Sequence, residues 1–195
     1  MPSPYLSFDQ LLGRVDEPYR SGFRRLLDEH GQLFRSARGS SHNHQAWPGG
    51  YADHVREAMN IAVVLYEALV PLRPVPFSLS DALVVMFVHD LEKPWAYEQG
   101  PEGWRRREGM KENAHAFRLA RLEEAGLTLP AELERAVVFV EGEGGKYSNS
   151  ERGMTPLAAF CHMCDVASAR LWHDYPMESG DPWPGARRER DHRLS

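Results

Sequence analysis

Apolar residues recur along this chain at the three- and four-residue spacing typical of amphipathic helices. Residues 17–34 show one such apolar face, and residues 51–69 carry a longer one. The same reasoning predicts further helices over residues 80–94, 111–125, 130–141 and 155–173. No internal repeat and no pair of strands is evident between them. The pattern therefore predicts an all-α fold, a compact bundle of helices around one apolar core.

Residues that interrupt helices separate these segments. Residues 35–50 are rich in Ser, Gly and His and are expected to form a loop, as is the polar and aromatic stretch 95–109. Ser80 is a suitable N-cap for the central helix, which we expect to end near Pro94. The longest amphipathic segment, residues 51–69, is followed by three closely spaced prolines that should end it.

Length and charge narrow the class of protein. The 195 residues suit one domain, predicted over residues 1–175, with a loosely held tail over residues 176–195. The 23 basic and 28 acidic side chains give a formal net charge of −5, which argues against a broad nucleic-acid surface but not against a local basic pocket. With no apolar run of membrane-spanning length and no leader pattern, we expect a cytoplasmic protein without a membrane partner.

The pair His89-Asp90 closes the most apolar helical run of the chain. An imidazole and a carboxylate at the end of a buried helix are costly unless something pairs with them, and a metal ion would pair with both. His54 lies beside the apolar stripe of the long helix, and Asp165 lies in a mostly apolar late helix. Two imidazoles and two carboxylates suit one divalent ion, with positions left for water and substrate. The residue types do not distinguish Mn, Co, Zn, Fe and Mg.

The order of these four residues resembles the H…HD…D signature of the HD superfamily of metal-dependent phosphohydrolases. The segment from His44 to His54 matches the family pattern H-x-x-x-x-G-G-x-x-x-H, and residues 89–93 match HD-x-x-K. The residues around Asp165 are similar to those around the last aspartate of the family. The resemblance covers residues 41–170. It implies an all-helical fold with a central metal site, and hydrolysis of phosphate esters or anhydrides.

The resemblance also suggests catalytic roles near the metal. Asp90 would be essential, Glu92 would position the attacking water, and Lys93 would touch a metal-bound phosphate. His115 lies where two-metal members carry a further histidine, but no histidine occupies residues 139–143, where another would fall. We therefore favour one metal, with His115 as a phosphate or water contact. A surface position for His115, and a helix-dipole role for Lys93, are the alternatives.

Several residues are candidates for binding the substrate. Arg106 lies in a run of three arginines near aromatic side chains, a combination that suits nucleotide phosphates and bases. Lys146, in a glycine-rich turn, is a similar phosphate candidate, and Lys93 would share this role. His44 and Trp47 precede the first ligand and would line the mouth of the pocket. A solvated loop is the alternative interpretation of the arginine run.

The function predicted from these features is hydrolysis of a phosphate ester or anhydride of a (deoxy)nucleotide by metal-activated water. The partner is then a small-molecule nucleotide, and a homo-oligomer is left open. One alternative is an HD-type nuclease or phosphodiesterase, similar to bacterial 3′-to-5′ exoribonucleases or acting on cyclic nucleotides. The acidic charge and the lack of room for a separate nucleic-acid-binding domain disfavour it. Another alternative is a non-catalytic HD sensor, which would not need all four ligands.

Overall fold

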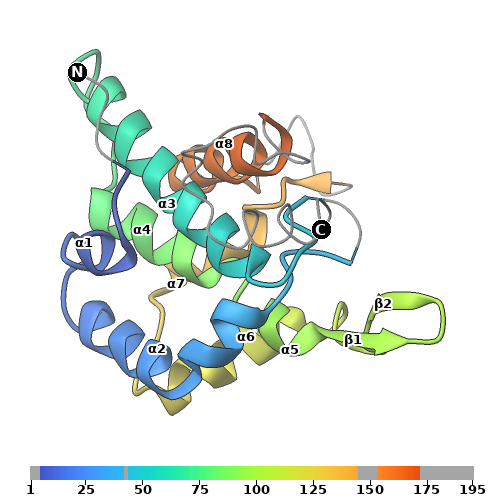
Figure 1. Ribbon diagram of the computed structural model, residues 1–195. Coiled ribbons are helices and arrows are strands. Elements are labelled where there is room, and N and C mark those ends of the chain that lie inside the picture. The colour runs from blue at the N-terminus through green and yellow to red at the C-terminus, as the bar shows by residue number, and fades with distance from the viewer. Residues whose placement is uncertain (1–4, 42–43, 145–152, 172–195) are drawn as a thin grey trace.

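Helices make up nearly all the regular structure in the computed structural model, which describes residues 5–41, 44–144 and 153–171 (Figure 1). The elements in chain order are α1 (Phe8–Leu12), α2 (Tyr19–Ser36), α3 (Gly50–Leu69), α4 (Leu79–Val88), α5 (Lys93–Ala96), β1 (Tyr97–Gly100), β2 (Gly103–Arg106), α6 (Ala114–Glu124), α7 (Ala131–Phe139) and α8 (Pro156–Leu171). These elements confirm the predicted bundle of helices. The predicted tail, residues 176–195, lies outside the described residues.

The central element of the bundle is α4, because its sequence is apolar on every side. It packs against α3, α7 and α8, and all but two of its residues are buried (Figure 1). Phe87, near its C-terminal end, stacks on Phe23 of α2 with ring centroids 4.0 Å apart. Since α4 is covered along its length, the residues that follow it also lie in the interior. This placement brings His89 and Asp90 into the core.

The two longest helices are amphipathic rather than uniformly apolar. The helix predicted over residues 51–69 is observed as α3, Gly50–Leu69, and the one predicted over residues 17–34 is observed as α2, Tyr19–Ser36. Helix α2 buries its apolar face and exposes the other, whereas α3 has no exposed residue between Gly50 and Val63 and is exposed only near its C-terminal end. Within the described ranges, no helix combines the length and the apolarity needed to cross a membrane.

The start of α4 differs from the prediction by two residues. Ser78, not Ser80, is the N-cap: its hydroxyl accepts a hydrogen bond from Asp81 N at 3.0 Å, and the Asp81 carboxylate accepts one from Ser78 N at 2.9 Å. This reciprocal capping box needs an acidic or amide side chain three residues after the cap, and the residue three after Ser80 is Leu83. Ser80 is instead buried, where its hydroxyl accepts from Asp16 N at 2.8 Å.

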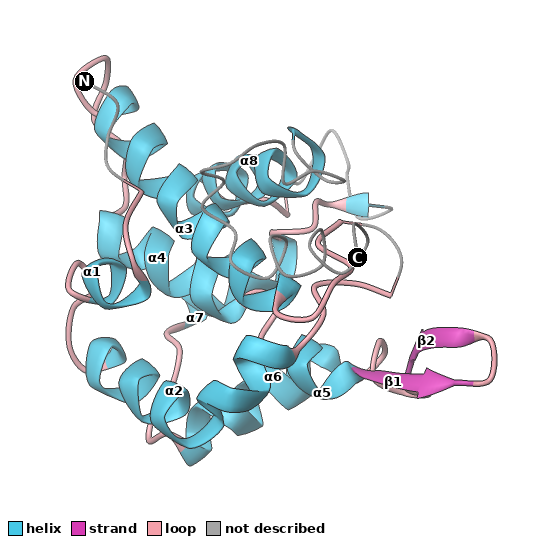
Figure 2. Cartoon of the chain, viewed as in Figure 1, coloured by secondary structure: helices cyan, strands magenta, loops and turns pink. Residues whose placement is uncertain are grey.

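The loop predicted over residues 95–109 is wrong in part. It contains the end of α5 and an antiparallel hairpin of β1 and β2, which projects from the helices (Figure 2). Glu98 and Arg105 face each other across the two strands and form an ion pair at 2.8 Å. No residue of either strand is fully buried, and the strands lack the alternation of apolar and polar residues by which a half-buried strand is predicted.

The stacked phenylalanines should contribute strongly to stability. We expect Phe87→Ala to lower the free energy of unfolding by about 3–5 kcal/mol, because it leaves a cavity against Phe23 in the middle of the bundle. Chemical denaturation followed by circular dichroism measures this change. Leu72→Ala is the control, since Leu72 is 81% exposed and its loss should change stability by less than about 0.5 kcal/mol. Equal effects of the two substitutions would contradict the packing described for α4.

Candidate metal centre

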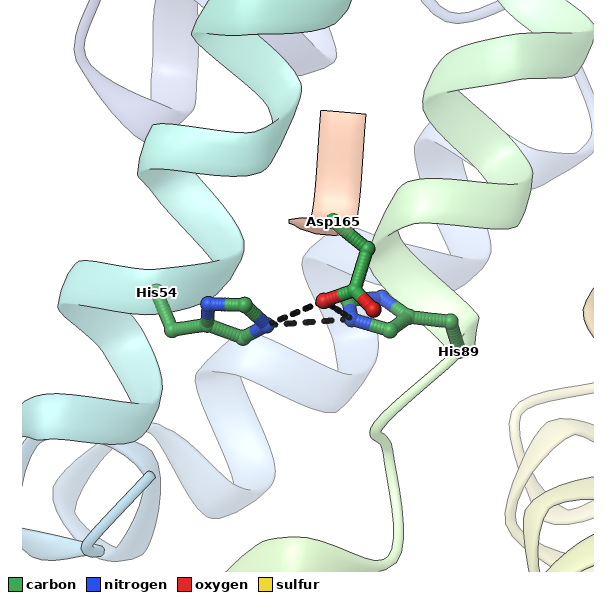
Figure 3. A group of neighbouring side chains, drawn as sticks. All are labelled: His54, His89 and Asp165. Carbon is green, nitrogen blue, oxygen red and sulfur yellow. Dashed lines mark hydrogen bonds and ion pairs between the residues drawn. The ribbon is translucent and has the colours of Figure 1, made fainter. Parts of the chain in front are cut away.

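Three side chains from distant parts of the sequence meet inside the bundle (Figure 3). His54 comes from α3, His89 from the C-terminal end of α4, and Asp165 from α8. His54 Nε2 lies 3.2 Å from His89 Nε2 and 3.1 Å from Asp165 Oδ1, and His89 Nε2 lies 3.6 Å from the same oxygen. One donor atom from each residue lies within 4.8 Å of the others, which is close enough for a single metal ion. These three residues are called the His–His–Asp cluster below.

Asp90, the fourth predicted ligand, lies at the edge of this cluster. Its Oδ2 is 3.4 Å from both His54 Nε2 and His89 Nε2. The same oxygen is 2.5 Å from Nζ of Lys93, which lies one turn further along the chain. Asp90 therefore contacts the cluster and a buried ammonium group at once. Its predicted role as a ligand stays a prediction.

Both histidines are oriented by bonds from their outer ring nitrogen. His89 Nδ1 donates to the carbonyl oxygen of Met86 at 2.7 Å, so its Nε2 faces the cluster without a proton when the ring is neutral. His54 Nδ1 lies 3.0 Å from Oγ of Ser168, on α8. A hydrogen-bonded outer nitrogen and a free inner nitrogen are typical of metal-binding histidines.

The charges in the cluster favour ionised carboxylates. Burial alone would raise the pKa of Asp90, but Lys93 and His89 hold it well below its usual range. Burial would also raise the pKa of Asp165, but hydrogen bonds from His54 and His89 lower it strongly. For His89, burial lowers the pKa, yet Asp90 and Asp165 outweigh burial and raise it. Two carboxylates and one ammonium leave one unit of negative charge when both imidazoles are neutral.

These donors fit a divalent cation. Two Nε2 atoms 3.2 Å apart, each with its lone pair directed inward, repel each other unless a proton or a cation lies between them. Imidazole nitrogens with carboxylate oxygens suit borderline divalent ions such as Zn²⁺, Mn²⁺, Co²⁺ and Fe²⁺. The cluster could therefore hold a metal ion, whose identity the donors alone do not fix.

Glu92, predicted to position water, has both carboxylate oxygens engaged elsewhere. Oε1 accepts a hydrogen bond from Arg106 Nη2 and Oε2 accepts one from Arg118 Nε, each at 2.6 Å, and the carboxylate is fully buried. Arg106, predicted to bind substrate, is therefore bonded to this buried carboxylate. The two ion pairs join the start of α5 to β2 and α6. The structure thus gives Glu92 and Arg106 a structural role, and their predicted functional roles stay predictions.

Two other predicted residues are bonded to side chains outside the cluster. His115 Nε2 is 2.9 Å from Glu134 Oε1, and this contact between α6 and α7 is partly exposed. Trp47 is buried, and its Nε1 donates to Asp53 Oδ2 at 2.9 Å. Lys146 lies outside the described residues. The predicted substrate contacts of these three residues stay predictions.

His44 does lie beside the cluster, with its ring centroid 5.0 Å from that of His54. Burial lowers its pKa to about 4, and the positive charge of Lys93 adds to the effect, so the ring is neutral at pH 7. Its neighbour Gln45 is completely buried and contacts Ser168. Sequence reasoning missed both Gln45 and Ser168. The available signal for Ser168 was its position three residues after Asp165 in an apolar helix.

A separate cavity of about 380 Å³ opens between α1, α2 and the start of α3. Its walls include Phe8, Phe34 and Val55, and its rim carries both acidic and basic side chains, among them Asp28 and Arg35. No residue of the His–His–Asp cluster lines this cavity. The mixed charge does not select a ligand, so we assign the cavity no part in the chemistry of the cluster.

Comparison of the chain with models of protein families, with curated proteins and with solved structures finds no match. The interpretation of the site therefore depends on its own residues and their geometry.

The buried ion pairs of Glu92 give a prediction about stability. We expect Glu92→Ala to lower the free energy of unfolding by about 3–5 kcal/mol, because it leaves the guanidinium of Arg118 buried without a counter-ion. Glu98→Ala is the matched control: Glu98 pairs with Arg105 on the exposed hairpin, and its loss should cost less than about 1 kcal/mol. Urea denaturation of both variants measures the difference. A Glu92→Ala protein as stable as Glu98→Ala would refute the structural role.

Proposed function

We propose that this chain is an HD-type metal-dependent phosphohydrolase that cleaves a phosphate ester or anhydride of a nucleotide. The observation that carries the proposal is the meeting of His54, His89 and Asp165 within the reach of one ion, from three helices far apart in sequence. Asp90 lies at 3.4 Å from both imidazoles, in the order that the H…HD…D resemblance requires. An apolar helical core has no packing reason to collect four such groups.

A bound divalent ion would supply a Lewis acid for a phosphoryl oxygen and a source of hydroxide near neutral pH. His54, His89 and Asp165 would hold it, with Asp90 beside them. The ammonium of Lys93, held by Asp90 at 2.5 Å, lies beside the cluster and would neutralise charge on phosphoryl oxygens. His44 is neutral and adjacent to His54, so its ring is suited to bind or orient a polar group of the substrate.

One observation favours a second interpretation. Lys93 already neutralises Asp90, so the same side chains would also be compatible with a metal-free polar network in a protein that performs no catalysis. Such a network satisfies its buried charges by internal hydrogen bonds and a protonated imidazole. A metal-free network of this kind would fit the non-catalytic HD sensor, one of the alternatives that the sequence left open. The two interpretations differ in one property, the uptake of a divalent ion.

Metal uptake therefore tests the proposal directly. Purified protein, stripped by a chelator and dialysed against Zn²⁺, Mn²⁺ or Co²⁺, should retain about one ion per chain by elemental analysis, because its donors are preorganised. His54→Gln and Asp165→Asn should lose that ion. His30→Gln and Asp28→Asn, both on α2, are matched controls that should keep it. A wild-type protein that retains none of these ions would leave only the metal-free network.

The bond that is cut can be identified with a panel of substrates. We expect release of phosphate or polyphosphate from deoxynucleoside mono- or triphosphates in the presence of Mn²⁺, Co²⁺ or Mg²⁺. Asp165→Asn should lower kcat/KM by at least about 100-fold, because it removes a charged ligand from the ion that activates water. Cyclic dinucleotides and a short single-stranded RNA belong in the same panel. Cleavage of RNA alone would replace the nucleotidase proposal with the nuclease alternative.

A further inference from the structure

We propose that Gln45 and Ser168 are positioning residues that hold the His54 ring by its Nδ1 atom with Nε2 directed into the cluster, and so prepare this histidine to bind metal. Hydrogen bonds join His44, Gln45, Ser168 and His54 in a continuous chain, which is buried except at His44. His44 Nδ1 lies 2.7 Å from Gln45 Oε1, Gln45 Nε2 lies 3.1 Å from Ser168 O, and Ser168 Oγ lies 3.0 Å from His54 Nδ1. The inference deepens the proposed metal site, and its functional consequence rests on that site.

The direction of the first bonds follows from the backbone. The carbonyl oxygen of Ser168 can only accept, so the Gln45 atom that faces it must be the amide nitrogen. This contact fixes the orientation of the Gln45 side chain and turns its Oε1 toward His44. Because Oε1 can only accept, His44 Nδ1 must donate. The amide of Gln45 thus orients the ring next to the cluster.

The same amide also restricts the hydroxyl of Ser168. Gln45 Nε2 lies 3.4 Å from Ser168 Oγ and donates toward one of its lone pairs. When a metal ion occupies the cluster, the second lone pair can accept the Nδ1 proton of His54 at 3.0 Å. Without metal, Nε2 faces Asp165 Oδ1 at 3.1 Å and His89 Nε2 at 3.2 Å, which favour a proton on Nε2, and the Ser168 hydroxyl can then donate to Nδ1 instead. Ser168 therefore holds the ring with Nε2 directed into the cluster in both states.

The backbone of Gln45 has a left-handed conformation that the surrounding contacts stabilise. Its φ is +45°, in the left-handed region that non-glycine residues rarely adopt. Its carbonyl oxygen accepts hydrogen bonds from Gly39 N at 3.0 Å and Trp47 N at 2.9 Å. A Cβ added at Gly50 would lie 1.8 Å from this oxygen, so only glycine fits there. Strained and tightly determined backbone of this kind concentrates at functional sites.

The expected effect can be measured with metal bound. Nitrogen NMR of the imidazole rings in the Zn²⁺-loaded protein should show a proton on Nδ1 of His54, hydrogen-bonded to Ser168 Oγ. Ser168→Ala and Gln45→Leu should shift the Nδ1 resonance and raise the dissociation constant for Zn²⁺ by about 10–100-fold. Ser168→Thr, which keeps the hydroxyl, should restore the Nδ1 resonance and the affinity. Ser80→Ala is the matched control, since this buried serine bonds Asp16 N at the other end of α4.

The outcomes separate this inference from the proposed function. If the wild-type protein binds Zn²⁺ and Ser168→Ala binds it equally well with the same Nδ1 resonance, the positioning role is refuted. If the wild-type protein binds Zn²⁺ but hydrolyses no nucleotide, the proposed function fails, and the affinities of the variants still test the inference. A wild-type protein that binds no metal overturns both. Circular dichroism confirms that each variant is folded. Should both substitutions prevent folding, the Zn²⁺-loaded wild-type protein decides, because a His54 Nδ1 without a hydrogen-bonded proton overturns the positioning role.

Discussion

The burial of ionisable side chains at the end of α4 is the constraint on which the rest of the structure depends. Moving carboxylates and imidazoles out of water is costly, so the surrounding helices must supply partners for them. Lys93 pairs with Asp90, and the carbonyl of Met86 accepts from His89. These partners come from the same stretch of chain as the groups they satisfy. The remaining bonds must come from α3 and α8, and they fix how these helices pack on α4.

The parts of the fold that follow from local sequence were predictable. The bounds of α3 agree with the prediction to within one residue, because an apolar stripe and a proline-rich segment mark its length. The residue types predicted His54, His89, Asp90 and Asp165 as a set, because burying a histidine or an aspartate in an apolar helix is costly unless it has a partner. The structure groups three of them within reach of one ion, with Asp90 at the edge. The hairpin of β1 and β2 could not be predicted in this way. Its side chains are exposed or only partly buried, and neither strand has a buried face.

The contacts of the site depend on which helices pack against one another in the folded chain. The sequence around each residue does not show this packing. Glu92 follows the HD pair closely, so proximity in sequence suggested a catalytic role. In the folded chain its oxygens face Arg106 and Arg118, from segments 14 and 26 residues away. Gln45 was overlooked for the same reason. It lies in a polar loop, and only the packing of this loop on α8 makes it a buried residue in contact with Ser168.

The paired glycines before the first histidine acquire a physical explanation from this packing. Gly49 has φ +87° and is the N-cap of α3, a conformation that suits glycine. Gly50 begins the helix and leaves room for the carbonyl oxygen of Gln45. His54 follows one turn later on the same helix. Gly50, which contacts Gln45, and His54, which Ser168 contacts, therefore belong to one rigid element. In this chain the glycines therefore do more than make a turn, because they allow the preceding loop to pack where Gln45 reaches Ser168, the residue that bonds the His54 ring.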